Sequence, residues 1–281
     1  MFFMARRSTQ EPHQLRTAAT DRIARLYHWQ RFDALRLRAF LSDHKIYCSN
    51  PSTFNDPWDC KPHFNTEILD DPTERENHVR WDVELCRRHN HNMTAEHISR
   101  METKLLADRE LLARTIDQLS EQMWPTIAAR YRIYCLGPDV GNLLMWSHYA
   151  DNHRGICLEF STRNEVMCSP QPVEYVSAFP LIRAYSKDLY ENLRLLLVKA
   201  EVWKYEKEYR LIAQERGEST PDETLMTDNN FLQLPQSALM SIIVGCQGPY
   251  DAVRDIVAQV QPALRVRKAI RVPNRFELQI A

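Results

Sequence analysis

Residues 144–160 read Leu-Met-Trp-Ser-His-Tyr-Ala-Asp-Asn-His-Arg-Gly-Ile-Cys-Leu-Glu-Phe, and the two halves of this segment follow different patterns. Residues 142–150 predict a short helix, whereas the apolar run at 155–160 predicts a strand. Gly155, at the junction, is expected to allow a sharp turn. A tryptophan, a histidine and a tyrosine lie within four residues of the first half, so the segment is a packing unit or part of a polar site.

Outward from this segment, strand and helix patterns alternate along the chain. The expected strands are 25–29, 45–49, 132–136, 155–160, 173–176, 208–213, 238–244, 265–269 and 276–280. The expected helices are 32–41, 142–150, 188–202 and 251–260. This mixture predicts an α+β fold, a split and mostly antiparallel sheet with flanking helices.

A change of composition marks residues 67–130, where charge is dense and apolar residues recur at helical spacing. We expect a helical insertion of three or four helices there, within one domain that spans 21–281. Residues 1–20 are polar and lack periodicity, which predicts a flexible N-terminal tail.

The composition is that of a globular protein: of 281 residues, 44% are hydrophobic and 26% charged, and the net charge is −1. Such a balance gives no overall attraction to nucleic acid. The seven cysteines form no C-x-x-C pair and several lie in apolar runs, which predicts free thiols in a reducing compartment. We find no signal-peptide pattern and no window near the roughly 18 apolar residues of a membrane span, so a cytoplasmic protein without membrane contact is expected.

Two carboxylates stand out at Glu206 and Glu208, on either side of Lys207, where a predicted helix gives way to a strand. In extended chain, residues two apart share a face, so both carboxylates are expected to point the same way. Paired carboxylates repel unless a positive or hydrogen-bonding group lies between them. A ribose hydroxyl, a basic substrate or a neighbouring arginine can be this group. The alternative without a ligand is that both glutamates lie on an edge strand exposed to solvent.

Further candidates lie at a first strand and in a turn. Tyr27 and His28 fall in the first expected strand, and Asn55 with Asp56 precede a proline, a sequence that builds turns without any ligand. The histidines of the opening segment lie five residues apart, which does not place them on one helix face as a zinc pair, so no metal is expected. The short supply of glycine, six residues, excludes a glycine-rich phosphate loop.

Four spaced motifs together resemble the bacterial family DUF2971, a domain of unknown function. They are Leu26-Tyr27-His28, Phe54-Asn55-Asp56-Pro57, Met145 to Ala150 with His153-Arg154-Gly155, and Trp203 with Glu206, Glu208, Tyr209 and Arg210. The resemblance runs from about Arg25 to Ala213, with the helical insertion as a variable region. It departs at Gly137, where such sequences often have serine, so any ligand contact of that serine is missing here.

The order of His28, Tyr149 and Glu208 also resembles that of the ADP-ribosyltransferase superfamily, and Glu206-x-Glu208 is similar to the paired glutamates of its arginine-directed members. The resemblance implies that NAD is the substrate. His28 would then bond the ribose, Tyr149 would stack on the nicotinamide, and Glu208 would stabilise the oxocarbenium-like charge. Glu206 would orient or deprotonate the acceptor.

The leading expectation is therefore an ADP-ribosyltransferase or NAD-cleaving enzyme, acting as a toxin, effector or phage-defence component on a protein or nucleic acid. Residues expected to bind NAD are Tyr27, His28, Asn55, Asp56, Trp146, His148, Tyr149 and Arg210. The alternatives are a non-catalytic module of the same fold that binds a ligand or nucleic acid, and a nuclease-type toxin using His28, Glu208 and Arg210. Catalysis on NAD requires an imidazole, a phenol and a carboxylate in one cavity.

Overall fold

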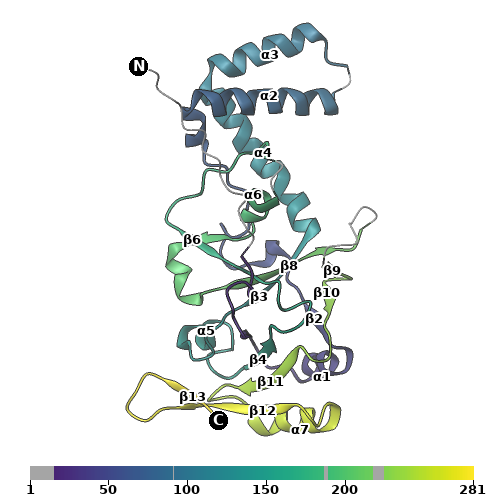
Figure 1. Ribbon diagram of the computed structural model, residues 1–281, viewed down its shortest axis with the longest axis vertical. Coiled ribbons are helices and arrows are strands. Elements are labelled where there is room, and N and C mark those ends of the chain that lie inside the picture. The colour runs from purple at the N-terminus through teal and green to yellow at the C-terminus, as the bar shows by residue number, and fades with distance from the viewer. Residues whose placement is uncertain (1–15, 91, 187–188, 218–224) are drawn as a thin grey trace.

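A computed structural model describes residues 16–90, 92–186, 189–217 and 225–281, and the fold is α+β with curled, mostly antiparallel sheets (Figure 1). Most of the predicted tail, residues 1–15, lies outside the described residues. The molecule is elongated, with two helices at one end and the last helix and strands at the other. None of the described helices is both long and apolar enough to cross a membrane.

The larger sheet has the strand order β1-β4-β11-β12-β13. Its strands are β1 (Arg25–Gln30), β4 (Ile156–Ser161), β11 (Leu239–Val244), β12 (Arg265–Arg271) and β13 (Leu278–Ile280). Neighbours are antiparallel except β11 and β12, which are parallel and are joined by α7 (Tyr250–Val260). Helix α1 (Ala34–Asp43) packs beside α7, and both helices cover the apolar core of this part.

A second sheet has β8 (Tyr209–Glu215) in its centre, between β3 (Tyr131–Leu136) and β5 (Gln171–Pro172). The short β9 (Met226–Thr227) also pairs with β8. Two further ribbons pair β2 (Lys45–Tyr47) with β10 (Phe231–Gln233), and β6 (Glu174–Val176) with β7 (Val198–Ala200). The two sheets meet where Tyr27 of β1 bridges Gly137 just after β3.

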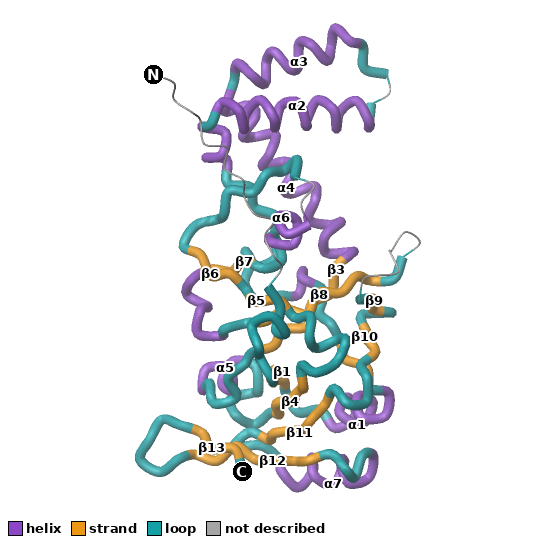
Figure 2. The backbone as a smooth tube through the Cα atoms, in the orientation of Figure 1, coloured by secondary structure: helices purple, strands orange, loops and turns teal. Residues whose placement is uncertain are grey.

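Helices α2 (Pro72–His89), α3 (Ala95–Ala107) and α4 (Arg109–Arg130) follow the short 3₁₀ turn η2 (Thr66–Asp70) and lie in the segment predicted as a helical insertion. Each begins at a side chain that accepts backbone N–H groups, namely Asp71, Thr94 and Asp108. Helices α2 and α3 form the far end of the molecule, and α4 runs back to the sheets (Figure 2). The insertion has an apolar core of its own.

The helix predicted over 188–202 was wrong beyond Arg194. Helix α6 (Leu189–Arg194) stops there, and the chain continues as β7 and then as a 3₁₀ helix, η3 (Glu201–Glu206). The β-branched Val198 suits a strand, and β7 pairs in parallel with β6. This extended conformation points Lys199 into the protein, where it is buried.

Gly155 is required because two backbone segments approach each other closely at this position. The predicted role of Gly155, to allow a sharp turn, was wrong. In the turn before Gly155 the left-handed residues are Asp151, Asn152 and His153, with φ of 49°, 54° and 64°, and no glycine has a positive φ among the described residues. A Cβ atom on Gly155 would lie 2.3 Å from the backbone oxygen of Gln30. The absent side chain therefore lets β4 begin directly beside the end of β1.

We predict that Gly155→Ala lowers the free energy of unfolding by about 3 kcal/mol, because the new methyl group meets backbone that cannot move aside cheaply. Gly141→Ala is the control, since the nearest atom to its Cβ would be a side-chain oxygen of Asp139 at 3.4 Å. Urea denaturation of both variants measures the difference. Equal stability of the two variants would show that the close approach is not tight.

Candidate functional site

Five charged side chains, each at most 6% exposed, form a buried ion network: Asp59, Lys199, Glu206, Glu208 and Arg210. The Lys199 Nζ atom lies 2.6 Å from Glu206 Oε2 and 3.3 Å from Glu208 Oε2. Arg210 donates to both oxygens of Glu208, through Nε at 2.9 Å and Nη2 at 3.0 Å, and to Asp59 Oδ2 at 2.7 Å. Buried charges are tolerated only when paired and hydrogen-bonded, and each of these five is.

Three consecutive elements supply most of this network. Lys199 comes from β7, Glu206 from the last residue of η3, and Arg210 from β8. Lys207 between the glutamates has a left-handed conformation with φ of 48°, so the predicted extended alternation of Glu206 and Glu208 was wrong. The two carboxylates nevertheless point to the same place, because the ammonium group of Lys199 lies between them.

Tyr149 joins the network from the end of α5 (Leu143–His148). Its hydroxyl donates a hydrogen bond of 2.6 Å to Glu206 Oε1, and the other oxygen of Glu206 accepts from Lys199. Burial and the bond to Glu206 both raise the pKa of Tyr149, so the phenol stays protonated. The structure thus brings together three of the predicted catalytic residues: Tyr149, Glu206 and Glu208.

The pKa values of the two glutamates are shifted in opposite directions. Burial raises the pKa of Glu206 above its usual range, although Lys199 acts against this shift. Burial acts on Glu208 in the same sense, but the charges of Arg210 and Lys199 outweigh it and lower the pKa of Glu208 to about 2. Glu208 is therefore a permanent anion that is fully engaged by its cations, and Glu206 is the carboxyl that takes up a proton first as the pH falls.

His28, the fourth predicted catalytic residue, lies on the other face of the second sheet. Its ring stacks on Tyr134 of β3 with centroids 4.1 Å apart, whereas the thiol of the next residue, Cys135, bonds the carboxylate of Glu208. Successive side chains of a strand point to opposite faces, so β3 separates His28 from Glu208. The structure does not bring the imidazole and the carboxylate into one cavity.

The remaining predicted residues are dispersed. Tyr27 and Trp146 are buried in the core, where Tyr27 donates to Glu159 and the indole N–H of Trp146 donates to the Val140 carbonyl. His148 and Asn55 are exposed. Asp56 is 6% exposed, accepts a bond from the Trp58 N–H, and lines a cavity beside the ion network.

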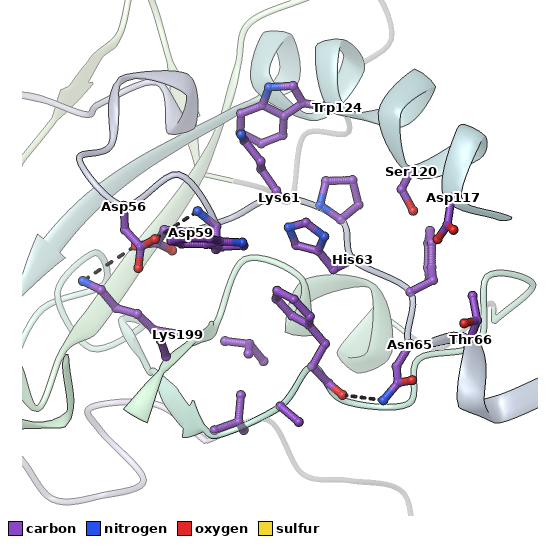
Figure 3. Close-up of a pocket in the computed structure, with 18 of the residues that line it drawn as sticks. Asp56, Asp59, Lys61, His63, Asn65, Thr66, Asp117, Ser120, Trp124 and Lys199 are labelled. Carbon is purple, nitrogen blue, oxygen red and sulfur yellow. Dashed lines mark hydrogen bonds and ion pairs between the residues drawn. The ribbon is translucent and has the colours of Figure 1, made fainter. Parts of the chain in front are cut away.

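This cavity has a volume of about 930 Å³ and lies between the segment 56–66, helix α4 and the loop after β6 (Figure 3). Asp59 and Lys199 form one wall, so the cavity adjoins the ion network. His63, on the same segment as Asp59, stacks on Phe179 with ring centroids 4.2 Å apart. The Lys61 ammonium lies 5.9 Å from the ring centroid of Trp124.

The accessible charge of the cavity is mainly negative. Asp117 and Glu121 line it from α4 and both are exposed, whereas the charges of Asp59 and Lys199 are already paired. Burial and the charge of Lys61 lower the pKa of His63, so its imidazole is neutral at pH 7. The buried Nε2 atom of His63 has no hydrogen-bond partner in the part of the chain that the structure describes. A flat ligand that carries positive charge or donates hydrogen bonds suits these walls.

Sequence reasoning missed Lys199, Asp59 and the residues of this cavity other than Asp56. One pattern pointed to Lys199: it follows the apolar run Leu195 to Val198, where a lysine must be paired if the run is buried. Asp59 lies two residues after the predicted Asn-Asp-Pro turn. No local pattern indicated that α4 covers this turn, because the two are distant in the chain.

Residues 145–211 match the model of a family described as "Protein of unknown function (DUF2971)". The match supports the predicted resemblance over this segment, and its description names no activity. The segment contains Tyr149, Lys199, Glu206, Glu208 and Arg210, so the family pattern coincides with most of the ion network. No curated protein and no solved structure matches the chain.

We predict that Lys199→Met destabilises the protein by about 3–5 kcal/mol, because it leaves the buried Glu206 and Glu208 without their shared cation. The control is Lys204→Met. Lys204 is 69% exposed and pairs with Glu201 at 3.6 Å, so its loss changes stability by less than about 0.5 kcal/mol. Chemical denaturation of both variants measures the two effects. A loss below about 1 kcal/mol for Lys199→Met would mean that water reaches the network.

His28 provides a pH-dependent test of the fold. Burial lowers the pKa of His28 to about 4 from 6.5, although the bond to the Cys135 carbonyl acts in the opposite direction. Between these values the unfolded chain binds the proton and the folded chain does not, so stability falls with falling pH. We expect the wild type to lose about 2 kcal/mol more than His28→Asn between about pH 7 and about pH 4.5 in denaturation experiments. Parallel curves for the two proteins would contradict the burial of the ring.

Proposed function

We propose that this protein is a ligand-binding module that takes up a small, planar, positively charged molecule in the cavity beside the ion network. One observation carries the proposal: a cavity of about 930 Å³ combines aromatic walls with exposed carboxylates. Such a volume lies within the range of sites for small ligands. The chemical class meant here is an aromatic cation such as an N-substituted pyridinium, or a compact amine.

The aromatic walls supply the ring contacts. Trp58 is 60% exposed and Phe179 is 39% exposed, and both line the cavity together with Trp124. The face of an aromatic ring attracts cations, and flat rings also stack on it with apolar burial. Asp117 and Glu121 add the negative field that a cation requires. Among the described residues that line the cavity, the cations are the half-buried Lys61 and Lys199, which is already paired with carboxylates, so the cavity favours a cation over an anionic group such as a diphosphate.

ADP-ribosyl transfer, the leading expectation from the sequence, requires an accessible glutamate opposite His28. Glu208 is 4% exposed and both of its oxygens accept from Arg210, while His28 lies across the sheet. This arrangement favours the alternative reading, binding without transfer. The nicotinamide ring of NAD is itself a planar cation, so NAD remains one of the ligands to be tested.

The test is a titration of the protein with 1-methylnicotinamide, a planar cation. Nicotinamide, which has a similar ring but no charge, is the control ligand. Because Trp58 and Trp124 line the cavity, we expect binding to quench tryptophan fluorescence. The cation should bind more tightly, and the double variant Asp117→Asn, Glu121→Gln should weaken its binding about fivefold to tenfold, or about 1–1.4 kcal/mol. Glu110→Gln is the control on the same helix, with a side chain that is 76% exposed, and should change nothing.

Two results would refute the proposal. Equal affinity of the double variant and the wild type for the cation would mean that the cation does not bind in this cavity. Release of nicotinamide from labelled NAD by the wild type, above the background without protein, would mean that the module is catalytic after all.

A further inference from the structure

A second cavity, of about 850 Å³, lies on the face of the second sheet that is opposite to Glu208. Helix α1, the ribbon of β2 and β10, and the strands β1 and β3 enclose it; α1 lies against β2 (Figure 1). His28 and Tyr134 form part of its floor. Its chemistry differs from that of the first cavity, so the two do not compete for one ligand.

Three cations surround this second cavity: Arg31, Arg36 and Lys45. All three are exposed, and the structure records no ion pair for any of them within the described ranges. Free guanidinium groups bind phosphate through paired N–H donors. Although Arg31 also interacts with the charge of Asp151, the three cations give the mouth of the cavity a positive charge that suits a phosphate.

Two exposed rings lie beside these cations. Tyr47 of β2 and Phe231 of β10 face each other across the ribbon, with centroids 5.5 Å apart and planes inclined by 72°. They are 52% and 44% exposed, so both rings are accessible to a ligand. Exposed aromatic rings next to a positive groove are the usual contact for nucleobases, because every base can stack on them.

The floor and sides of the cavity supply hydrogen-bonding groups for a ligand. The Tyr134 side chain is 4% exposed, and its hydroxyl has no hydrogen-bond partner among the described residues. His28 Nδ1 lies 2.7 Å from the Cys135 carbonyl, so this nitrogen carries the proton and Nε2 is left as an acceptor. The carboxylates of Asp43 and Asp228 also line the cavity, and carboxylates accept bonds from sugar hydroxyls.

From these groups we infer that the second cavity binds a nucleotide unit. The base stacks against Tyr47 and Phe231, the phosphate lies between Arg31 and Arg36, and the sugar hydroxyls donate to the carboxylates. The unit is either a free mononucleotide or one residue of a single-stranded RNA, since both present the same base, sugar and phosphate. No chemical step is implied.

Calorimetry and fluorescence anisotropy with four probes test this inference: adenosine 5′-monophosphate, adenosine, inorganic phosphate and a fluorescently labelled single-stranded RNA decamer. We expect the monophosphate to bind at least tenfold more tightly than adenosine or phosphate alone. Arg31→Gln with Arg36→Gln, and separately Tyr47→Ala, should each weaken binding at least tenfold. Tighter, strongly salt-dependent binding of the decamer would identify an RNA strand as the source, and preference for the monophosphate would identify a free nucleotide.

The controls separate this site from the first cavity and from general charge effects. Arg100→Gln removes a side chain that is 71% exposed on the helical insertion and should leave nucleotide binding unchanged. Trp58→Ala should weaken only the ligand of the first cavity. Because the exchanged side chains are exposed, the fold should persist, as circular dichroism will verify. Binding of phosphate as tight as that of the monophosphate, unchanged affinity in the variants, or no binding of any probe would overturn the inference.

Discussion

The pairing of Lys199 and Arg210 with three buried carboxylates is the interaction on which the arrangement of this protein depends. Each charge alone would cost several kcal/mol to bury, so the network is stable only when all its parts are in place. It ties together β7, η3, β8 and the segment that carries Asp59, and Tyr149 links α5 to it. Segments far apart in the chain are thus held by one requirement, the neutralisation of buried charge.

The same requirement shapes the surface next to the network. Glu208 and Arg210 are hydrogen-bonded to each other inside the protein, so neither is available to a ligand. The adjoining cavity is lined by the outermost residues of the network and by aromatic and acidic residues around them. The second sheet then divides the polar chemistry of the molecule into two. The first cavity has exposed carboxylates and the imidazole of His63, and the second has three exposed cations together with His28 at its floor.

Local patterns predicted the strands well where they were short, apolar and bounded by turn residues. The strands predicted at 25–29, 132–136 and 238–244 differ from β1, β3 and β11 by one residue at one end. The helix predicted to 202 failed because leucines at helical spacing continue to Leu197, directly before β7, and only pairing with β6 makes the next residues extended. For the site, Tyr149, Glu206 and Glu208 were grouped correctly, whereas Lys199 was hidden in that same predicted helix and His28 was grouped with them wrongly.

The sequence by itself determined the α+β composition, the position of most elements and the presence of polar residues that a core can hold only in pairs, since these follow from periodicity, turn residues and charge within short windows. Only the tertiary structure decided which charges meet and which face each side chain takes. A residue on β1 and a residue beside β8 could lie on the same side of β3 or on opposite sides. Contacts between distant segments set the register of the sheets, and this register decides which of the two arrangements forms. Proximity in three dimensions is not encoded in any single window of the chain.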